Sequence, residues 1–165
     1  MVGETETLCG SAIENNIVDK QKCAYIIQIL SHLKQENKVF HQFAAQFLNA
    51  MALRTLKSFS QVELADFIQK RFVFFQAALA KKKAIHIYKP LNEQSWLAKK
   101  RILEFVNEDM PYLLHTIEEL LKEYPTLQAT RKLHPILGVN LDMRGKIKDV
   151  HKPTGLTRNF SYIYI

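Results

Sequence analysis

Cysteine, glycine and proline are scarce in this sequence, whose 165 residues include only two, five and five of them. The two cysteines, Cys9 and Cys23, stand at no metal-binding or redox spacing, so we expect neither a zinc site nor a disulfide framework. Two lone thiols in a mostly helical region favour a reducing compartment. The cysteine content therefore predicts a cytoplasmic protein.

Long apolar runs and nucleotide-binding motifs are also missing. The longest apolar runs, such as residues 24–30, are interrupted and fall far short of the roughly 20 residues that a membrane-spanning helix needs. Residues 1–7 are acidic and lead into no apolar segment, which argues against a secretory signal. Neither G-x-G-x-x-G nor G-x-x-x-x-G-K-S/T occurs, so nucleotide phosphates have no recognisable cradle. We expect a soluble protein without a cofactor site.

The formal net charge of +7 raises the question of a polyanionic partner. The basic clusters are short: one covers residues 81–83 at the end of an expected helix, and the other covers residues 99–101 in an expected linker. Cations at the end of a helix complement its dipole, so a solvated surface explains both clusters. The alternative that stays open is an independent ferredoxin-like nucleic-acid-binding module that uses these clusters.

The first half of the chain is predicted to be helical. Residues 20–80 contain no proline or glycine, and apolar residues recur there at steps of three and four. Three helices fit, over about residues 19–35, 40–51 and 61–79. The third begins with a capping box, in which Ser60 caps the free amides and Glu63 reaches back. We therefore expect a helical unit over residues 12–80, preceded by a disordered terminus over residues 1–11.

The second half changes to a mixed pattern. Residues 84–88 alternate as a strand, and residues 101–106 are nearly all apolar, which predicts a central strand buried on both faces. An amphipathic helix over residues 113–124 follows, with Asp109 expected to cap it and Pro111 expected in its first turn.

Beyond this helix, residues 127–133 and 136–141 read as a long strand or a bent pair. A turn over residues 142–145 and a hairpin partner over 146–150 follow, and then a strand over 160–165. The order strand, helix, strand, strand is the first part of a βαββαβ unit, whose second helix and last strand are missing. The strand 84–88 and the preceding helices are a hypothetical replacement for them.

The predicted fold class is thus α+β, with a helical unit followed by an incomplete ferredoxin-like sheet domain over residues 83–165. The sequence stops inside an expected strand, without a polar tail. We expect it to be a piece of a longer polypeptide.

Two motifs resemble the large NAD-specific glutamate dehydrogenases. Residues 103–114 are similar to the run V-E-I-x-N-D-D-M-P-F-L-V of that family. About twenty residues later, residues 134–147 are similar to its segment H-P-x-L-x-x-x-R-D-x-x-G-x-L, at matching spacing. The resemblance covers residues 40–165. The chain departs from the pattern at Glu108, where the family has Asp, at His115 and Thr116, which replace Asp-Ser, and at Leu141, which replaces Arg.

The resemblance implies a function for the parent chain. Those enzymes convert L-glutamate, NAD and water to 2-oxoglutarate, ammonia and NADH, and their catalytic domain lies far downstream. The amino-terminal region is implied to hold ACT-like modules for assembly or amino-acid sensing. On this basis NAD belongs to the parent and no cofactor to this segment. The implied partners are the rest of the parent chain, sister subunits of a homo-oligomer and an amino-acid effector as an option, with no nucleic acid and no membrane.

The resemblance also selects candidate effector-binding residues. Residues 109–114 look like the ACT signature D-R-P-G-L-L, in which the glycine lets the loop close on a bound amino acid. Tyr112 stands at the glycine position, and its ring either argues against the usual pocket or fills it. The candidate residues are Asn107, Glu108, Asp109, Met110, Tyr112, Leu113 and His134.

Catalysis by the segment itself is not expected. Glu108 and Asp109 are adjacent carboxylates, but general acid and base need pKa values that differ, and a helix start favours the ionised form of both. His134 has no Cys, Asp or second His at ligand spacing, so an ordinary structural role is favoured over metal binding. We therefore expect no catalytic residue and no metal site.

Overall fold

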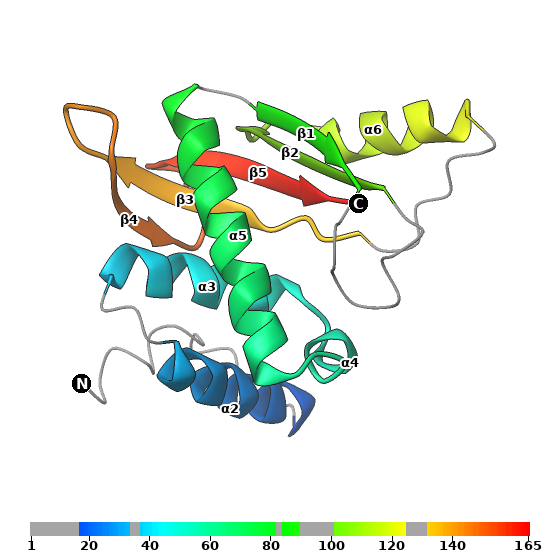
Figure 1. The fold of residues 1–165 in the computed structure, drawn as a ribbon. Helices are drawn as coiled ribbons and strands as arrows, with labels where there is room; N and C mark the ends of the chain where they lie inside the picture. Colours follow the sequence, from blue (N-terminus) through cyan, green and yellow to red (C-terminus); the bar gives the residue numbers. More distant parts are fainter. Residues whose placement is uncertain (1–16, 34–36, 82–83, 90–100, 125–131) are drawn as a thin grey trace.

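The computed structural model describes residues 17–33, 37–81, 84–89, 101–124 and 132–165. The terminus expected to be disordered, residues 1–11, lies outside these ranges, as does most of the expected strand 127–133. The fold class is α+β, as predicted. In the described part of the chain, four helices come first and a five-stranded antiparallel sheet follows (Figure 1). The helices are α2 (Ile17–His32), α3 (Lys38–Ala50), α4 (Leu53–Leu56) and α5 (Gln61–Ala80).

Local sequence signals explain where α5 and α3 begin. Before α5, the Ser60 side chain accepts a hydrogen bond from Glu63 N at 3.3 Å, and Ser60 N donates to Glu63 Oε2 at 2.8 Å. The predicted capping box is therefore present, and the bond from the Ser60 amide lowers the pKa of Glu63. Before α3, the Asn37 side chain accepts from the amides of Val39 and Phe40.

The sheet has the strand order β1-β2-β5-β3-β4. Its strands are β1 (Ala84–Tyr88), β2 (Ile102–Glu108), β3 (Ile136–Leu141), β4 (Ile147–His151) and β5 (Arg158–Tyr164). Helix α6 (Leu113–Lys122) joins β2 to β3, and β5 lies between these two strands and is antiparallel to both. This arrangement is that of the ferredoxin-like βαβ split by a third strand.

Strand β1 completes the sheet, as hypothesised. It pairs with β2 along its whole length, from Ala84 opposite Val106 to Tyr88 opposite Ile102. The predicted hairpin between β3 and β4 is also present, and Gly145 in its turn has φ of +76°. In a ferredoxin-like unit, the last strand of the unit would complete the sheet. Here that place is taken by β1, which precedes β2 in the chain.

The interpretation of residues 101–106 as a central strand buried on both faces is wrong. β2 is second from the edge, and its side chains alternate between buried and half-buried. Ile102 and Val106 are buried under the helices, whereas Leu103 and Phe105 face the other side and are half-buried. The central strand is β5, because β4 and β3 add two strands beyond it.

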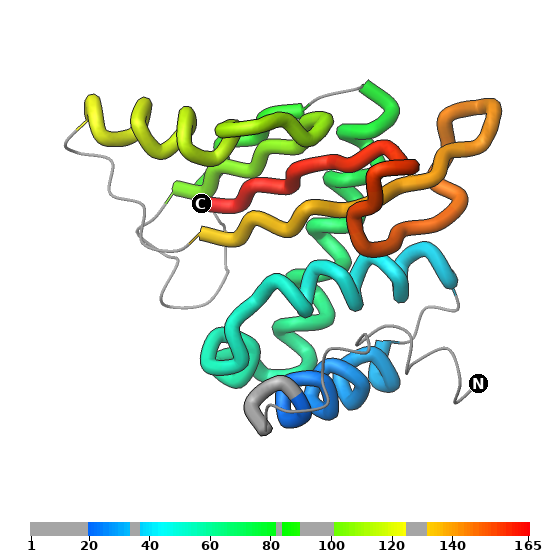
Figure 2. Tube along the Cα trace, turned by 180° about the vertical axis from the view of Figure 1, so that it is seen from behind, coloured from blue at the N-terminus to red at the C-terminus, as the bar shows by residue number. Residues whose placement is uncertain are grey.

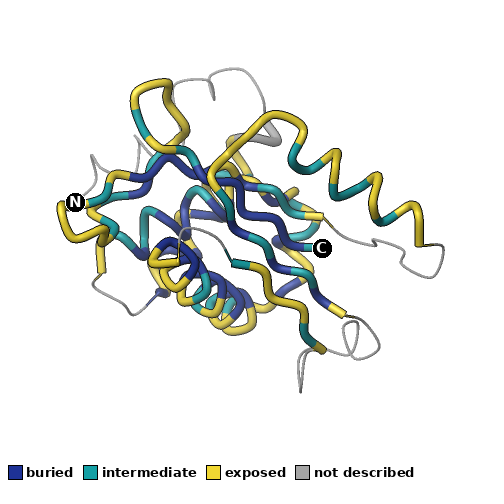
Figure 3. The backbone as a smooth tube through the Cα atoms, turned by 90° about the horizontal axis from the view of Figure 1, so that it is seen from above, coloured by how far each residue is buried: buried dark blue, intermediate teal, exposed yellow. Residues whose placement is uncertain are grey.

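The sheet is covered unequally on its two faces. Helices α3 and α5 lie on one face, and α6 lies on the opposite face (Figures 2 and 3). Aromatic side chains fill the space under α3 and α5: Tyr162 of β5 has its ring centroid 5.1 Å from that of Phe47 and 6.2 Å from that of Phe75. Helix α6 buries none of its residues, so the face that it covers is the more accessible one.

A buried ion pair joins α5 to the sheet. The Arg71 guanidinium contacts Glu104 Oε1, and both side chains are only 3% exposed. Arg71 Nη2 donates to the Tyr88 hydroxyl at 2.6 Å, and the Tyr162 hydroxyl donates to Glu104 Oε1 at 2.7 Å. Burial is the largest single influence and disfavours the charge of Arg71, but Glu104 together with Tyr162, Tyr88 and Tyr164 outweighs it, so the Arg71 pKa is raised. Burial and Glu104 also raise the pKa of Tyr162 well above its usual value.

The structure bears on two expectations drawn from composition, one about membrane-spanning helices and one about the cysteines. Within the ranges that the structure describes, no helix is long and apolar enough to cross a membrane. Cys23, in α2, is part of a disulfide bond. The expectation of two lone thiols is therefore wrong, and the cysteines give no support to a reducing compartment.

The buried pair makes a prediction for stability. Glu104→Gln leaves the Arg71 charge buried without its counter-ion, which we expect to lower the free energy of unfolding by about 3 kcal/mol. Arg71→Met should cost a similar amount. The double variant Arg71→Met with Glu104→Gln should lose much less than the sum of the two single losses, because neither charge remains buried. Urea unfolding of the four proteins measures this, and losses that simply add would contradict the prediction.

Candidate functional site

The candidate site is the turn that leads from β2 into α6. It contains six of the seven residues selected from the sequence, over residues 107–113. Asn107 and Leu113 are half-buried, and the Asn107 side chain donates to the Glu108 carbonyl at 3.0 Å. Met110 and Tyr112 are 50% and 79% exposed. Among the described residues, the turn is therefore open to solvent at its tip.

Tyr112 adopts a backbone conformation that suits glycine. Its φ of 63° and ψ of 7° lie in the left-handed region, and it is the only non-glycine residue with positive φ in the described part of the chain. At the position where the ACT signature has glycine, Tyr112 thus adopts a conformation that glycine takes without steric cost. Its ring is mostly exposed, so the interpretation that the ring fills the pocket is wrong.

The expected capping of α6 by Asp109 is also wrong. The helix begins at Leu113 with Tyr112 as its N-cap and has no side-chain capping bond, and Pro111 precedes its first turn. The Asp109 carboxylate instead accepts a hydrogen bond from the Ser161 hydroxyl at 2.5 Å. The left-handed residue turns the helix away from Asp109, which leaves this carboxylate beside the central strand.

Ser161 links Asp109 to His134. The Ser161 side chain is fully buried, and its Oγ lies 3.0 Å from His134 Nε2. Because the single hydroxyl proton of Ser161 points to Asp109, the Nε2–H of His134 is the donor in the second bond. The chain Asp109–Ser161–His134 therefore ties the turn, the central strand and the segment before β3 together.

Burial and nearby carboxylates act on the pKa of His134 in opposite directions. Burial lowers its pKa below the usual value for histidine, and the carboxylates of Asp109 and Glu118 act in the other direction. The net direction is downward, so the neutral ring is favoured at neutral pH. A neutral imidazole with its Nε2–H on a serine oxygen is a structural arrangement, not that of a nucleophile and its base.

Glu108 is held away from this chain of bonds. Its carboxylate accepts from Arg158 Nε at 3.0 Å and from Arg158 Nη2 at 3.3 Å. The hydrogen bond from Arg158 lowers the pKa of Glu108, although both side chains are about half exposed and the pair contributes little stability. The substitution of Glu for the Asp of the family pattern thus gives a pair with β5.

Sequence reasoning missed Ser161 and the buried pair of Arg71 and Glu104. Glu104 and Ser161 are polar residues in apolar stretches, and this is the signal that could have found them, whereas Arg71 follows Gln69 and Lys70 and gives no such signal. The structure also adds no metal site: within the described residues, no three side chains of His, Cys, Asp or Glu come together as ligands. In the two basic clusters, Lys81 and Arg101 are exposed, and the other members lie outside the described ranges.

Comparison with known protein families decides the relationship. Residues 43–165 match the family model described as glutamate dehydrogenase, ACT1 domain. The chain belongs to this family. The resemblance seen in the sequence is therefore confirmed. The matched residues of this ACT1 domain include most of α3, the whole of α5 and the whole sheet. No curated protein and no solved structure matches it.

Left-handed Tyr112 makes a first prediction for this ACT1 domain. Tyr112→Gly and Tyr112→Ala both remove the exposed ring, but only glycine adopts positive φ without steric cost. We expect Tyr112→Gly to be more stable than Tyr112→Ala by about 1 kcal/mol. Chemical unfolding monitored by circular dichroism measures the difference. If the alanine variant proved the more stable one, the left-handed conformation would be refuted.

The lowered pKa of His134 makes a second prediction. At pH values between the ordinary histidine pKa of about 6.5 and the lower folded value, the unfolded chain binds more protons than the folded chain. The contribution of His134 to the free energy of unfolding therefore falls as the pH falls. His134→Gln keeps an N–H donor but does not titrate. At pH 7.5 we expect the free energy of unfolding of the variant to lie within about 1 kcal/mol of that of the native chain. At pH 5 we expect the variant to be more stable relative to the native chain than it is at pH 7.5. Unfolding at several pH values tests this, and a constant difference would contradict it.

Proposed function

We propose that this chain is a non-catalytic regulatory segment of an NAD-specific glutamate dehydrogenase, in which the turn between β2 and α6 senses an amino-acid effector. The parent reaction would be the conversion of L-glutamate, NAD and water to 2-oxoglutarate, ammonia and NADH, with NAD bound in another part of the chain. Membership of the ACT1 family supports the parent assignment. A cytoplasmic location belongs to the same proposal and rests on the resemblance alone.

One observation carries the proposed role of the turn. Tyr112 keeps the glycine-like conformation, and its side chain points to solvent, so the backbone of the turn stays accessible. Positive φ costs free energy for a residue other than glycine, so the surrounding structure must hold Tyr112 in this conformation. The exposed Asp109 carboxylate beside the turn is suited to the ammonium group of an amino acid.

The network behind the turn gives a route for a response. Asp109 is bonded to Ser161 in the central strand, which is bonded in turn to His134. A ligand that draws the Asp109 carboxylate away would leave the buried Ser161 hydroxyl without its acceptor. Binding at the turn would thus be linked to the packing of β5 and of the segment before β3.

The test is a calorimetric titration of the 165-residue chain with glutamate and the other common amino acids. We expect one of them to bind and to raise the unfolding temperature, and Asp109→Asn to weaken that binding at least roughly tenfold. Asp66→Asn, which removes an exposed carboxylate of α5, is the matched control and should leave the affinity unchanged.

Absence of binding by every amino acid would refute effector sensing at the turn. A structural role in subunit contacts would then be what remains of the proposal. Strand β1 is suited to that role because it is an edge strand, and its Ile85 and Ile87 side chains are 65% and 64% exposed.

A further inference from the structure

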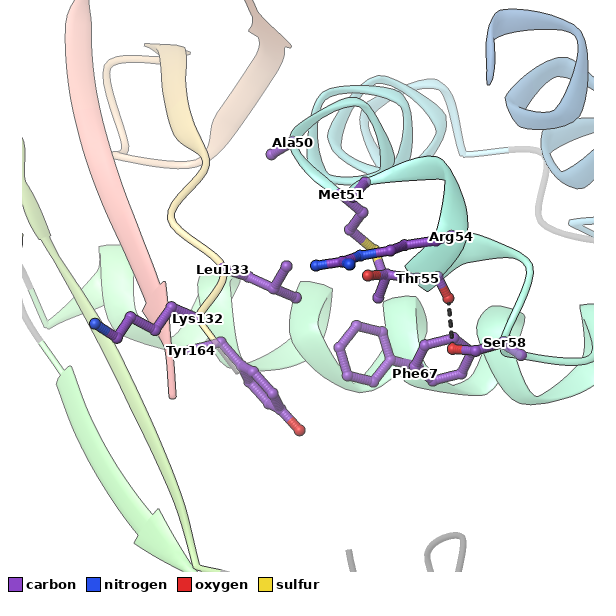
Figure 4. Close-up of a pocket in the computed structure, with 11 residues that line it drawn as sticks. Ala50, Met51, Arg54, Thr55, Ser58, Phe67, Lys132, Leu133 and Tyr164 are labelled. Atoms are coloured by element: carbon purple, nitrogen blue, oxygen red, sulfur yellow. Dashed lines mark hydrogen bonds between the residues drawn. The ribbon is translucent and has the colours of Figure 1, made fainter. Parts of the chain in front are cut away.

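A pocket lies between the helices and the sheet, away from the turn. It has a volume of about 540 Å³, within the range of small-molecule sites. Residues of α4 and the loop that follows it form one side, and the ends of two strand segments, at Leu133 and Tyr164, form the other (Figure 4). None of the seven residues selected from the sequence lines it.

The walls of the pocket are largely apolar and aromatic. Met51, Phe59, Phe67 and Tyr164 are all less than 10% exposed, and the rings of Phe67 and Tyr164 have centroids 5.4 Å apart at an angle of 79°. Flat apolar groups pack well against such rings. The walls therefore favour a ligand with an aromatic or branched apolar body.

Arg54 supplies the charge. Its guanidinium points into the pocket in Figure 4, between Leu133 and Phe67. The Arg54 guanidinium has no hydrogen bond or ion pair with any residue that the structure describes. Lys132 also lines the pocket, but its side chain extends away from it, and its Nζ is bonded to Glu118 Oε1 at 2.6 Å. Arg54 is thus the cation that a ligand would meet.

The pocket lacks an opposite charge. None of its eleven lining residues is an Asp or a Glu, and its other polar side chains are the hydroxyls of Thr55, Ser58 and Tyr164. The Ser58 hydroxyl already donates to the Thr55 carbonyl at 2.7 Å. A carboxylate would find the guanidinium, whereas an ammonium group would find no anionic partner and would lose hydration.

We propose that this pocket binds an organic carboxylate that has an apolar, preferably aromatic, body and no ammonium group, with Arg54 as the partner of the carboxylate. The ligand class differs from the amino acids proposed for the turn. This inference does not depend on the function proposed above, because Arg54 variants probe the pocket and Asp109 variants probe the turn.

Matched probes test the ligand class. 3-Phenylpropanoate has the required features, phenylalanine adds an ammonium group to it, 3-phenylpropanol removes its charge, and acetate removes its body. Titrations of the 165-residue chain should show 3-phenylpropanoate binding at least roughly tenfold more tightly than each of the other three. Equal or tighter binding of phenylalanine by the pocket would overturn the proposed class.

Matched variants test the site. Arg54→Gln should weaken 3-phenylpropanoate binding at least roughly tenfold, Arg54→Lys should weaken it less, and Lys132→Gln should change it by less than about twofold. Arg54 is exposed, so these variants are expected to keep the fold, and their unfolding temperatures check this. No binding of 3-phenylpropanoate at millimolar concentration, or binding that Arg54→Gln leaves unchanged, would refute the proposal.

Discussion

The ion pair between Arg71 and Glu104 is the contact on which the arrangement of helices and sheet depends. Arg71 lies in α5 and Glu104 in β2, and both are almost completely buried. Two buried charges are tolerated only when each is paired and hydrogen-bonded. Tyr88 from β1 and Tyr162 from β5 supply those hydrogen bonds, so a single cluster fixes α5 against three neighbouring strands. A shift of the helix along the sheet would break the contacts of Arg71 with Glu104 and with Tyr88 together.

The same cluster links β1 to the rest of the sheet. β1 follows α5 directly in the chain and pairs with β2 at the sheet edge. Its Tyr88 hydroxyl accepts from Arg71, so the helix and the strand are fixed by one side chain. The buried aromatic core is continuous from α3 through α5 to β5. The chain before β2 thus contributes both an edge strand and a covering layer to the ACT1 sheet.

The parts of the fold that local rules control could be predicted from the sequence. The capping box at Ser60, the alternation in residues 84–88 and the turn at Gly145 each depend on residues close together in the chain. The role of Asp109 could not be predicted in this way, because its partner Ser161 is 52 residues away. The left-handed Tyr112 escaped prediction because positive φ normally signals glycine. The central position of β5 depends on pairings with strands on both sides, which no local pattern encodes.

Because β1 is tied to α5 through Tyr88 and pairs with β2, we expect it to belong to the same cooperative unit as the central strand of the sheet. Amide hydrogen exchange of the 165-residue chain tests it most directly, since it measures the free energy of opening for each strand. We predict that the amides of β1 that are bonded to β2 exchange only with the global unfolding of β5. Fast exchange of those β1 amides, with β5 still protected, would contradict the account.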